Sequence, residues 1–229
     1  MQENVVCSAG AMLAFDIETM GVDKHQSKIT VISLYDPAEN ISRVMRFVEL
    51  NEYCDVVYCD DFQKKVDELV DVLNKAEFLC AFNGTSFDIP FIQIQFKIPN
   101  EIVQGWVLKC FDVLETCRRG FNRTFNLNLL LDLNKIGTGK TGSGMEAVHQ
   151  AERGDWKALE SYCMDDSRLT WEVSSLPVIH CPESYMWRKN NQNRSHNPAK
   201  VFKIDRRCFP GISFYHGPLS LGNPDTPCV

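Results

Sequence analysis

The stretch Ala11-Met-Leu-Ala-Phe-Asp16-Ile-Glu18-Thr19 carries the strongest structural signal in the chain. It opens on a run of apolar residues, which predicts a buried strand. Alternate residues of a strand point to the same face, so Asp16 and Glu18 are expected to lie side by side. Two carboxylates at that range repel unless a cation lies between them, so the pair indicates a divalent-metal site. A solvated strand end is the plain alternative, since about one Asp-x-Glu is expected by chance.

Strands and helices alternate through the first 176 residues. Further strands are predicted from short apolar and β-branched runs at 28–35, 42–48, 77–82 and 106–111. Apolar periodicity predicts helices over 62–73, 87–96, 126–133, 145–152 and 155–176. Asp60 or Asp61 is expected to cap the first of these helices. This order argues for an α/β, three-layer domain with a mixed five-stranded sheet flanked by helices.

Composition limits the class of protein. The 229 residues are 44% hydrophobic with a net charge of −6, which is too apolar and too weakly charged for a disordered chain. There is no run of about 18 apolar residues, so no membrane span is expected. The first residues lack a basic stretch followed by an apolar one, so no secretory signal is expected. The ten cysteines form no Cys-x-x-Cys pair, and we interpret them as reduced thiols of an intracellular protein, cytoplasmic or nuclear and not secreted.

Charge and proline content divide the chain near residue 176. Residues 1–179 hold 17 Lys and Arg against 27 Asp and Glu, whereas residues 180–229 hold seven against three. We therefore interpret 1–176 as the folded domain and 177–229 as a Pro-rich, basic tail of unknown role. The segments 199–204 and 211–216 could form a hairpin on the body, or the basic tail could guide nucleic acid to it. An acidic body does not suit a passive nucleic-acid binder, but clustered carboxylates suit a metal-dependent nuclease.

Two further acidic motifs follow the first. Asn83-Gly-Thr-Ser-Phe87-Asp88 comes directly after an apolar run, which puts a carboxylate at a strand-to-helix junction. Tyr162-Cys-Met-Asp-Asp166 lies in the last predicted helix, where residues four apart share one face. Each motif alone also has a purely structural explanation. The motif at 83–88 could be the N-terminal turn of a helix, and the motif at 162–166 could be a tyrosine packed at the rim beside an exposed acid. Finding all three motifs in this order has a chance expectation well under about 1%.

With these motifs the chain resembles the DEDD superfamily of 3′–5′ exonucleases, which have an RNase H-like fold. The tyrosine of the third motif is similar to that of the DEDDy branch. That branch includes the proofreading domains of family B DNA polymerases and the YprB-type RNase H-like domains. The resemblance covers about residues 10–176. It implies a metal-dependent 3′–5′ exonuclease that hydrolyses phosphodiester bonds at the single-stranded 3′ ends of DNA or RNA.

The resemblance also implies which residues are catalytic. Four acids, Asp16, Glu18, Asp88 and Asp166, would hold two divalent cations, Mg²⁺ or Mn²⁺. Asp16 would bridge both ions, Glu18 and Asp166 would complete the first, and Asp88 would support the second. Tyr162 would orient the attacking water. The acid next to Asp166 in the sequence competes for its role, but only Asp166 stands four residues from Tyr162.

Substrate contacts are implied for three residues, Thr19, Asn83 and Phe87. Phe87 would pack on a base, although Asn83 and Phe87 could equally be the scaffold that aims the acid of the second motif. The segment 118–125 mixes three arginines with two phenylalanines, which suits single-strand binding or a solvated helix end. Any polymerase or helicase partner is expected on a separate chain, and no membrane partner is expected.

A second class of function stays open at this point. The chain could be a catalytically idle RNase H-like domain that binds nucleic acid or docks a partner, which four intact acids fit poorly. Gly139-Lys-Thr141 lacks the glycine that a phosphate-binding loop needs at position 134. The histidines and cysteines of the tail match no zinc-binding spacing. Neither nucleotide nor zinc binding is therefore expected.

Overall fold

A five-stranded sheet with the order β3-β2-β1-β6-β7 forms the centre of the molecule in the computed structural model. The structure describes residues 12–121, 124–137, 143–182 and 201–205. β1 (Met12–Thr19), β2 (Ile29–Asp36) and β3 (Ile41–Arg46) form an antiparallel meander. β6 (Phe78–Ala81) and β7 (Cys110–Asp112) then add in parallel beside β1. The mixed sheet predicted from the sequence is thereby confirmed.

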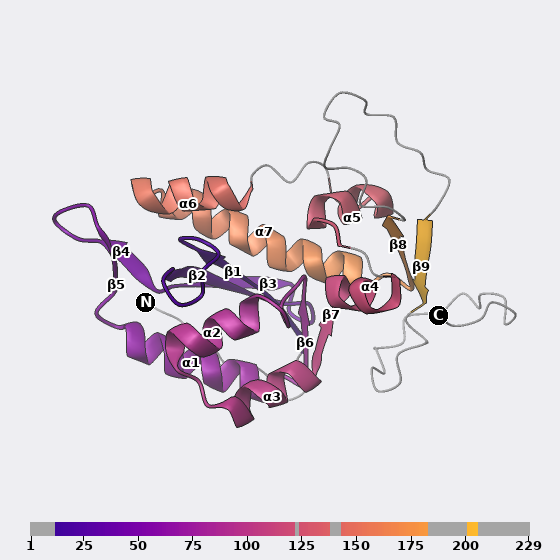
Figure 1. Ribbon diagram of the computed structural model, residues 1–229, viewed down its shortest axis with the longest axis horizontal. Coiled ribbons are helices and arrows are strands. Elements are labelled where there is room, and N and C mark those ends of the chain that lie inside the picture. Colours follow the sequence, from indigo (N-terminus) through magenta and orange to yellow (C-terminus); the bar gives the residue numbers. More distant parts are fainter. Residues whose placement is uncertain (1–11, 122–123, 138–142, 183–200, 206–229) are drawn as a thin grey trace, which may run out of the picture.

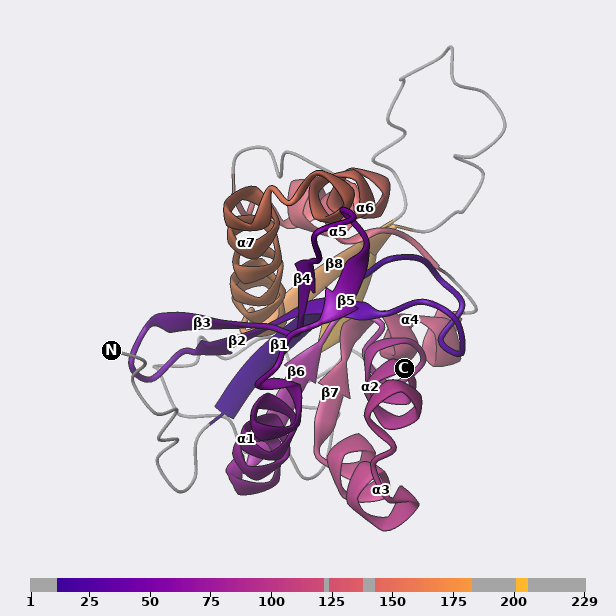
Figure 2. The same ribbon diagram turned by 90° about the vertical axis from the view of Figure 1, so that its left-hand side faces the viewer.

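Helices cover both faces of this sheet (Figure 1 and Figure 2). One face is covered by α1 (Phe62–Lys75), α2 (Asp88–Phe96) and α3 (Asn100–Leu108). The other is covered by α5 (Leu127–Asn134), α6 (Gly144–Arg153) and α7 (Trp156–Ser174). α4 (Val113–Phe121) follows β7 directly. The three layers and the α/β class agree with the sequence prediction.

The alternation of side chains along β1 decides which face carries the acids. Leu13, Phe15 and Ile17 are buried in the core that β1 shares with α1, α2 and α3. Ala14 is buried on the opposite face, against residues of α5 and α7. Asp16 and Glu18 have the parity of Ala14 and therefore face the α7 side of the sheet.

Within the part of the chain that the structure describes, two short antiparallel pairs lie outside the main sheet. β4 (Val48–Leu50) pairs with β5 (Val56–Tyr58), and β8 (Val178–Pro182) pairs with β9 (Val201–Asp205). β8 is fastened to α5, because Asn134 hydrogen-bonds both the amide and the carbonyl of His180 at 2.8 Å. The segment after residue 176 thus begins with a strand that contacts the body.

Only part of the predicted tail hairpin lies within the described residues. Residues 201–204 of its first segment belong to β9, which pairs with β8. Its second segment, 211–216, lies outside the described residues, so the pairing of the two segments stays a prediction. The loop Gly139–Thr141 and most of the basic tail also lie outside the described residues.

The predicted strand over 106–111 is wrong for its first half. α3 continues to Leu108, and only Cys110–Asp112 is extended. The helix buries Val103 and Trp106, which stand three apart on one face, and Trp106 Nε1 donates to Asn74 Oδ1 at 2.7 Å. A short apolar run does not distinguish a buried helix from a buried strand, and here the tertiary contacts of Trp106 favour the helix.

The start of α1 differs in detail from its prediction. Asp61 occupies the N-cap position but makes no capping bond to a backbone amide. Its carboxylate instead forms an ion pair with Lys65 at 2.7 Å. The helix begins where predicted, while the cap is replaced by an i,i+4 pair.

Six cysteines whose side chains the structure describes are free thiols: Cys54, Cys59, Cys80, Cys110, Cys163 and Cys181. This agrees with the reduced state inferred from the sequence. Among the helices that the structure describes, none combines the length and the apolar character needed to cross a bilayer.

Candidate functional site

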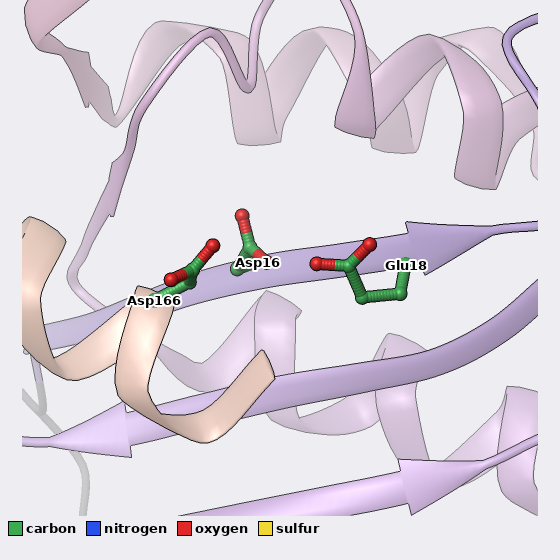
Figure 3. Close-up of side chains that lie close together, drawn as sticks. All are labelled: Asp16, Glu18 and Asp166. Carbon is green, nitrogen blue, oxygen red and sulfur yellow. The ribbon is translucent and has the colours of Figure 1, made fainter. Parts of the chain in front are cut away.

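Three acidic side chains meet where β1 and α7 pack together (Figure 3). One carboxylate oxygen from each of Asp16, Glu18 and Asp166 lies within 4.8 Å of the other two. The carboxylate of Glu18 turns back along the strand toward Asp16, and Asp166 approaches from α7. Glu18 and Asp166 are buried, and Asp16 is half-buried. Three like charges are costly to hold this close without a cation, and carboxylate oxygens suit Mg²⁺ and Mn²⁺, so the donor set fits a divalent cation.

The register of α7 separates two neighbouring acids. Asp166 is 5% exposed and belongs to the three-carboxylate cluster. Asp165 is exposed and forms an ion pair with Arg168 at 3.1 Å. Tyr162, one turn before Asp166, is half-buried and packs against an apolar cluster around Leu159. The alternative of a rim tyrosine beside an exposed acid does not describe this helix, because Asp166 is buried.

Cys163 contacts Asp16 from α7 and was not singled out in the sequence. Its Sγ lies 3.7 Å from Asp16 Oδ2, 3.4 Å from the Asp16 carbonyl oxygen and 3.3 Å from Ser33 Oγ. Burial, followed by the charges of Asp16 and Glu18, raises the pKa of the Cys163 thiol well above its usual value. The thiol therefore stays protonated and can donate to Asp16. Ser33 also donates to the Cys163 carbonyl at 2.7 Å, which fastens α7 to β2.

Asp88 lies beside the acidic strand, outside the three-carboxylate cluster. Its Oδ1 accepts a hydrogen bond at 3.2 Å from the amide of Ile17, the residue between Asp16 and Glu18. The side chain is 3% exposed. Burial, followed by the charge of Asp112, raises the pKa of Asp88 to about 7. A nearby cation would lower this pKa and favour the carboxylate.

The turn that leads to Asp88 is held by Asp112, which the sequence analysis also missed. Asp112 ends β7, is buried, and accepts hydrogen bonds from the amides of Asn83 at 3.0 Å and Thr85 at 2.9 Å. It further accepts the Thr85 hydroxyl at 2.7 Å and the Glu115 amide at 3.0 Å. Asn83 adopts a left-handed backbone with φ of 71°. The available signal was an acid directly between an apolar strand and a helix, the same context that identified Asp88.

The three residues predicted to contact substrate make contacts within the protein. Asn83 Oδ1 accepts a hydrogen bond from Arg118 at 3.2 Å. The ring of Phe87 packs on that of Phe91, with centroids 5.1 Å apart. Thr19 is buried, and its hydroxyl donates to the carbonyl of Gly21 at 2.6 Å. These contacts fit a scaffold around the acids, and contact with substrate stays a prediction for all three.

Comparisons with known proteins agree with this architecture. A family model described as RNase_H superfamily matches residues 13–176, a range that contains all three acidic motifs. The fold is similar to that of the family B DNA polymerase from the hyperthermophilic archaeon Pyrobaculum calidifontis, with a TM-score of 0.53 and 15% sequence identity. The similarity covers 75% of this chain and 25% of that one, so this chain spans about a quarter of the polymerase. No curated protein sequence matches the chain. Since the family model covers well over half of its residues, the chain belongs to the RNase H superfamily.

Proposed function

We propose that this chain is a metal-dependent 3′–5′ exonuclease of the DEDDy type that acts on single-stranded ends of DNA or RNA. The observation that carries the proposal is the meeting of Asp16, Glu18 and Asp166 within 4.8 Å at the contact of β1 and α7. Membership of the RNase H superfamily supports a hydrolase acting on nucleic acids. The similarity in fold to a family B DNA polymerase is consistent with such a substrate.

The acidic residues fit the roles that hydrolysis of a phosphodiester requires. Asp16, Glu18 and Asp166 would hold one divalent cation, and Asp88 would help to hold a second near Asp16. When bound, two such cations supply an activated water and stabilise the charge that develops on the leaving oxygen. The protein keeps these carboxylates in place through the Ile17 amide on Asp88 and the Cys163 thiol on Asp16.

Tyr162 is proposed to orient the attacking water with its hydroxyl. Tyr162 and Asp166 stand one helical turn apart, so both side chains leave the same face of α7. The side chain packs against the buried cluster of Val31, Ala147, Ala151, Leu159 and Cys163, which limits its movement. Removal of the hydroxyl alone should therefore change the reaction without changing the packing.

The proposed substrate also implies a location and a source of 3′ ends. We infer an intracellular location, with 3′ ends supplied by a polymerase or helicase on a separate chain. Both statements follow from the proposed substrate.

Release of mononucleotides from single-stranded DNA and RNA tests the proposal. The wild type is expected to release them with Mg²⁺ or Mn²⁺ and to release none in EDTA. Asp16→Asn is expected to be inactive but folded, while Asp165→Asn, which changes the adjacent exposed acid, keeps the wild-type rate. Full activity of Asp16→Asn would overturn the proposal. Binding of the strand without cleavage under any metal would favour the catalytically idle domain instead.

A further inference from the structure

The side chain of Arg118 reaches the second acidic motif, and the proposed chemistry gives it no role. Arg118 lies in the second turn of α4. Its Nη2 donates to Asn83 Oδ1 at 3.2 Å, and its Nη1 donates to Ser86 Oγ at 3.0 Å. Nη1 also donates to Glu115 Oε2 at 2.8 Å. The guanidinium is therefore fixed between α4 and the turn that leads to Asp88.

These contacts do not use all the donors of Arg118. A guanidinium has five N–H groups, and three hydrogen bonds are made here. The Nε–H and one Nη2–H thus have no partner among the described residues, and the side chain is 36% exposed. A guanidinium already held in one orientation loses little freedom when it binds an anion, and its planar fork matches the geometry of phosphate oxygens.

Arg118 also provides a positive charge in a part of the chain that is strongly acidic. The first 179 residues hold ten more acidic than basic residues, 27 against 17, and the candidate site itself is a cluster of carboxylates. A nucleic-acid strand is a polyanion, so its entry needs a cation near the acids. A chain of hydrogen bonds and backbone links Arg118 to the acidic site. Arg118 binds Asn83, which begins the turn that leads to Asp88. Asp88 in turn accepts from the amide of Ile17, the residue between the two acids of β1.

We propose that Arg118 binds a backbone phosphate of the single-stranded nucleic acid that enters this site. The inference rests on the proposed function, because it names a substrate contact of the same site. Glu115 and Ser86 hold the guanidinium in place on one side, and the remaining N–H groups bind the phosphate. The segment 118–125 was interpreted from the sequence either as a single-strand binding segment or as a solvated helix end. For Arg118, the proposed contact favours single-strand binding.

The salt dependence of binding tests this contact. Each phosphate contact with a single strand contributes about 0.7 to the slope of log affinity against log salt concentration. The affinity for a labelled oligothymidylate is measured at several KCl concentrations, in EDTA and in Ca²⁺. Arg118→Ala is expected to weaken binding about tenfold and to flatten the slope by about 0.7. Arg118→Lys keeps the charge, so it should keep the slope while binding more weakly.

Arg153→Ala is the matched control. Arg153 also pairs with a glutamate, Glu146, at 2.9 Å, but it lies at the end of α6 and is well exposed. Its loss should leave both affinity and slope unchanged. A misfolded turn would weaken strand binding in Arg118→Ala and in Arg118→Lys alike, without changing the salt slope in only one of them. Comparing the two variants therefore separates a loss of structure from the loss of a phosphate contact.

The outcomes distinguish this contact from the proposed function. A wild type that cleaves, together with an unchanged slope in Arg118→Ala, would overturn the contact and leave the exonuclease standing. A wild type that binds with an Arg118-dependent slope but never cleaves would overturn the exonuclease and leave the contact standing. A wild type that does not bind the strand would overturn both.

Discussion

The amide of Ile17 donates a hydrogen bond to Oδ1 of Asp88 at 3.2 Å, and so joins the first and second acidic motifs across 71 residues of sequence. The bond holds the Asp88 carboxylate beside the strand that carries Asp16 and Glu18. Asp88 is buried, so loss of the acceptor would leave the amide without a partner away from water. Asp88 is thus a structural residue as well as a proposed metal ligand, and substitution can separate the two roles.

Asp88→Asn and Asp88→Ala are expected to lose activity equally but to differ in stability. Both remove the charge, so mononucleotide release should fall at least about a hundredfold. Asn keeps an oxygen for the Ile17 amide, whereas Ala leaves the amide unsatisfied and should lower the free energy of unfolding by about 1–3 kcal/mol. Urea denaturation in EDTA measures the difference. Equal stability of the two variants would show that the Ile17 bond contributes nothing.

Tyr162→Phe should lower the rate of cleavage without weakening metal binding. The phenyl ring keeps the packing around Leu159, while loss of the hydroxyl that orients water should slow turnover about 10–100-fold. The rise in melting temperature on adding Mg²⁺ should match that of the wild type. Tyr53→Phe, at a side chain that is 75% exposed, is the control and should change neither quantity. Loss of the Mg²⁺ effect in Tyr162→Phe would instead assign the hydroxyl to metal binding.

Gly84→Ala should destabilise the turn before Asp88. A Cβ at Gly84 would lie 2.3 Å from the Cβ of Ala81 and 3.3 Å from the ring of Phe15. Both neighbours are buried, so we expect a loss of about 2–4 kcal/mol in the free energy of unfolding. Gly105→Ala in α3 is the control, because nothing lies within 4 Å of its Cβ position, and it should gain about 0.5–1 kcal/mol. Equal melting temperatures for the two variants would contradict the crowding at Gly84.

Asp112→Ala should be among the most destabilising single changes at an acid. It removes the acceptor of three backbone or hydroxyl bonds in the turn 83–85 and one bond at the start of α4. We expect a loss of about 3–5 kcal/mol, with Asp112→Asn intermediate because it keeps one oxygen. Asp71→Ala removes an exposed pair with Lys75 at 2.6 Å and should cost less than about 1 kcal/mol. Calorimetry of the three variants checks this order.

Local patterns in the sequence predicted those parts of the fold whose signals are themselves local. β1 was found from its apolar run, and the prediction that Asp16 and Glu18 share one face of the strand follows from the two-residue period alone. Asp166 was preferred over Asp165 from a four-residue spacing, and the structure places Asp166 with the other acids. Such features need no knowledge of neighbouring elements.

The features that were missed depend on contacts between distant segments. α3 was misread because the bond from Trp106 to Asn74 cannot be seen in the run around Trp106. The role of Asp112 depends on β7 lying beside β6, which brings its carboxylate to the turn after β6. The pairing of β8 with β9 likewise joins two segments of the predicted tail that no local pattern linked to each other.

Cleavage of a 5′-labelled single strand tests the central claim most directly. Labelled DNA and its RNA counterpart are incubated with Mg²⁺, Mn²⁺ or EDTA, with the wild type and with Asp16→Ala. We expect a metal-dependent ladder that shortens from the 3′ end for the wild type and an intact strand for Asp16→Ala. Undiminished cleavage by Asp16→Ala, or release of the labelled 5′ nucleotide as the first product, would contradict a 3′–5′ exonuclease built on these carboxylates.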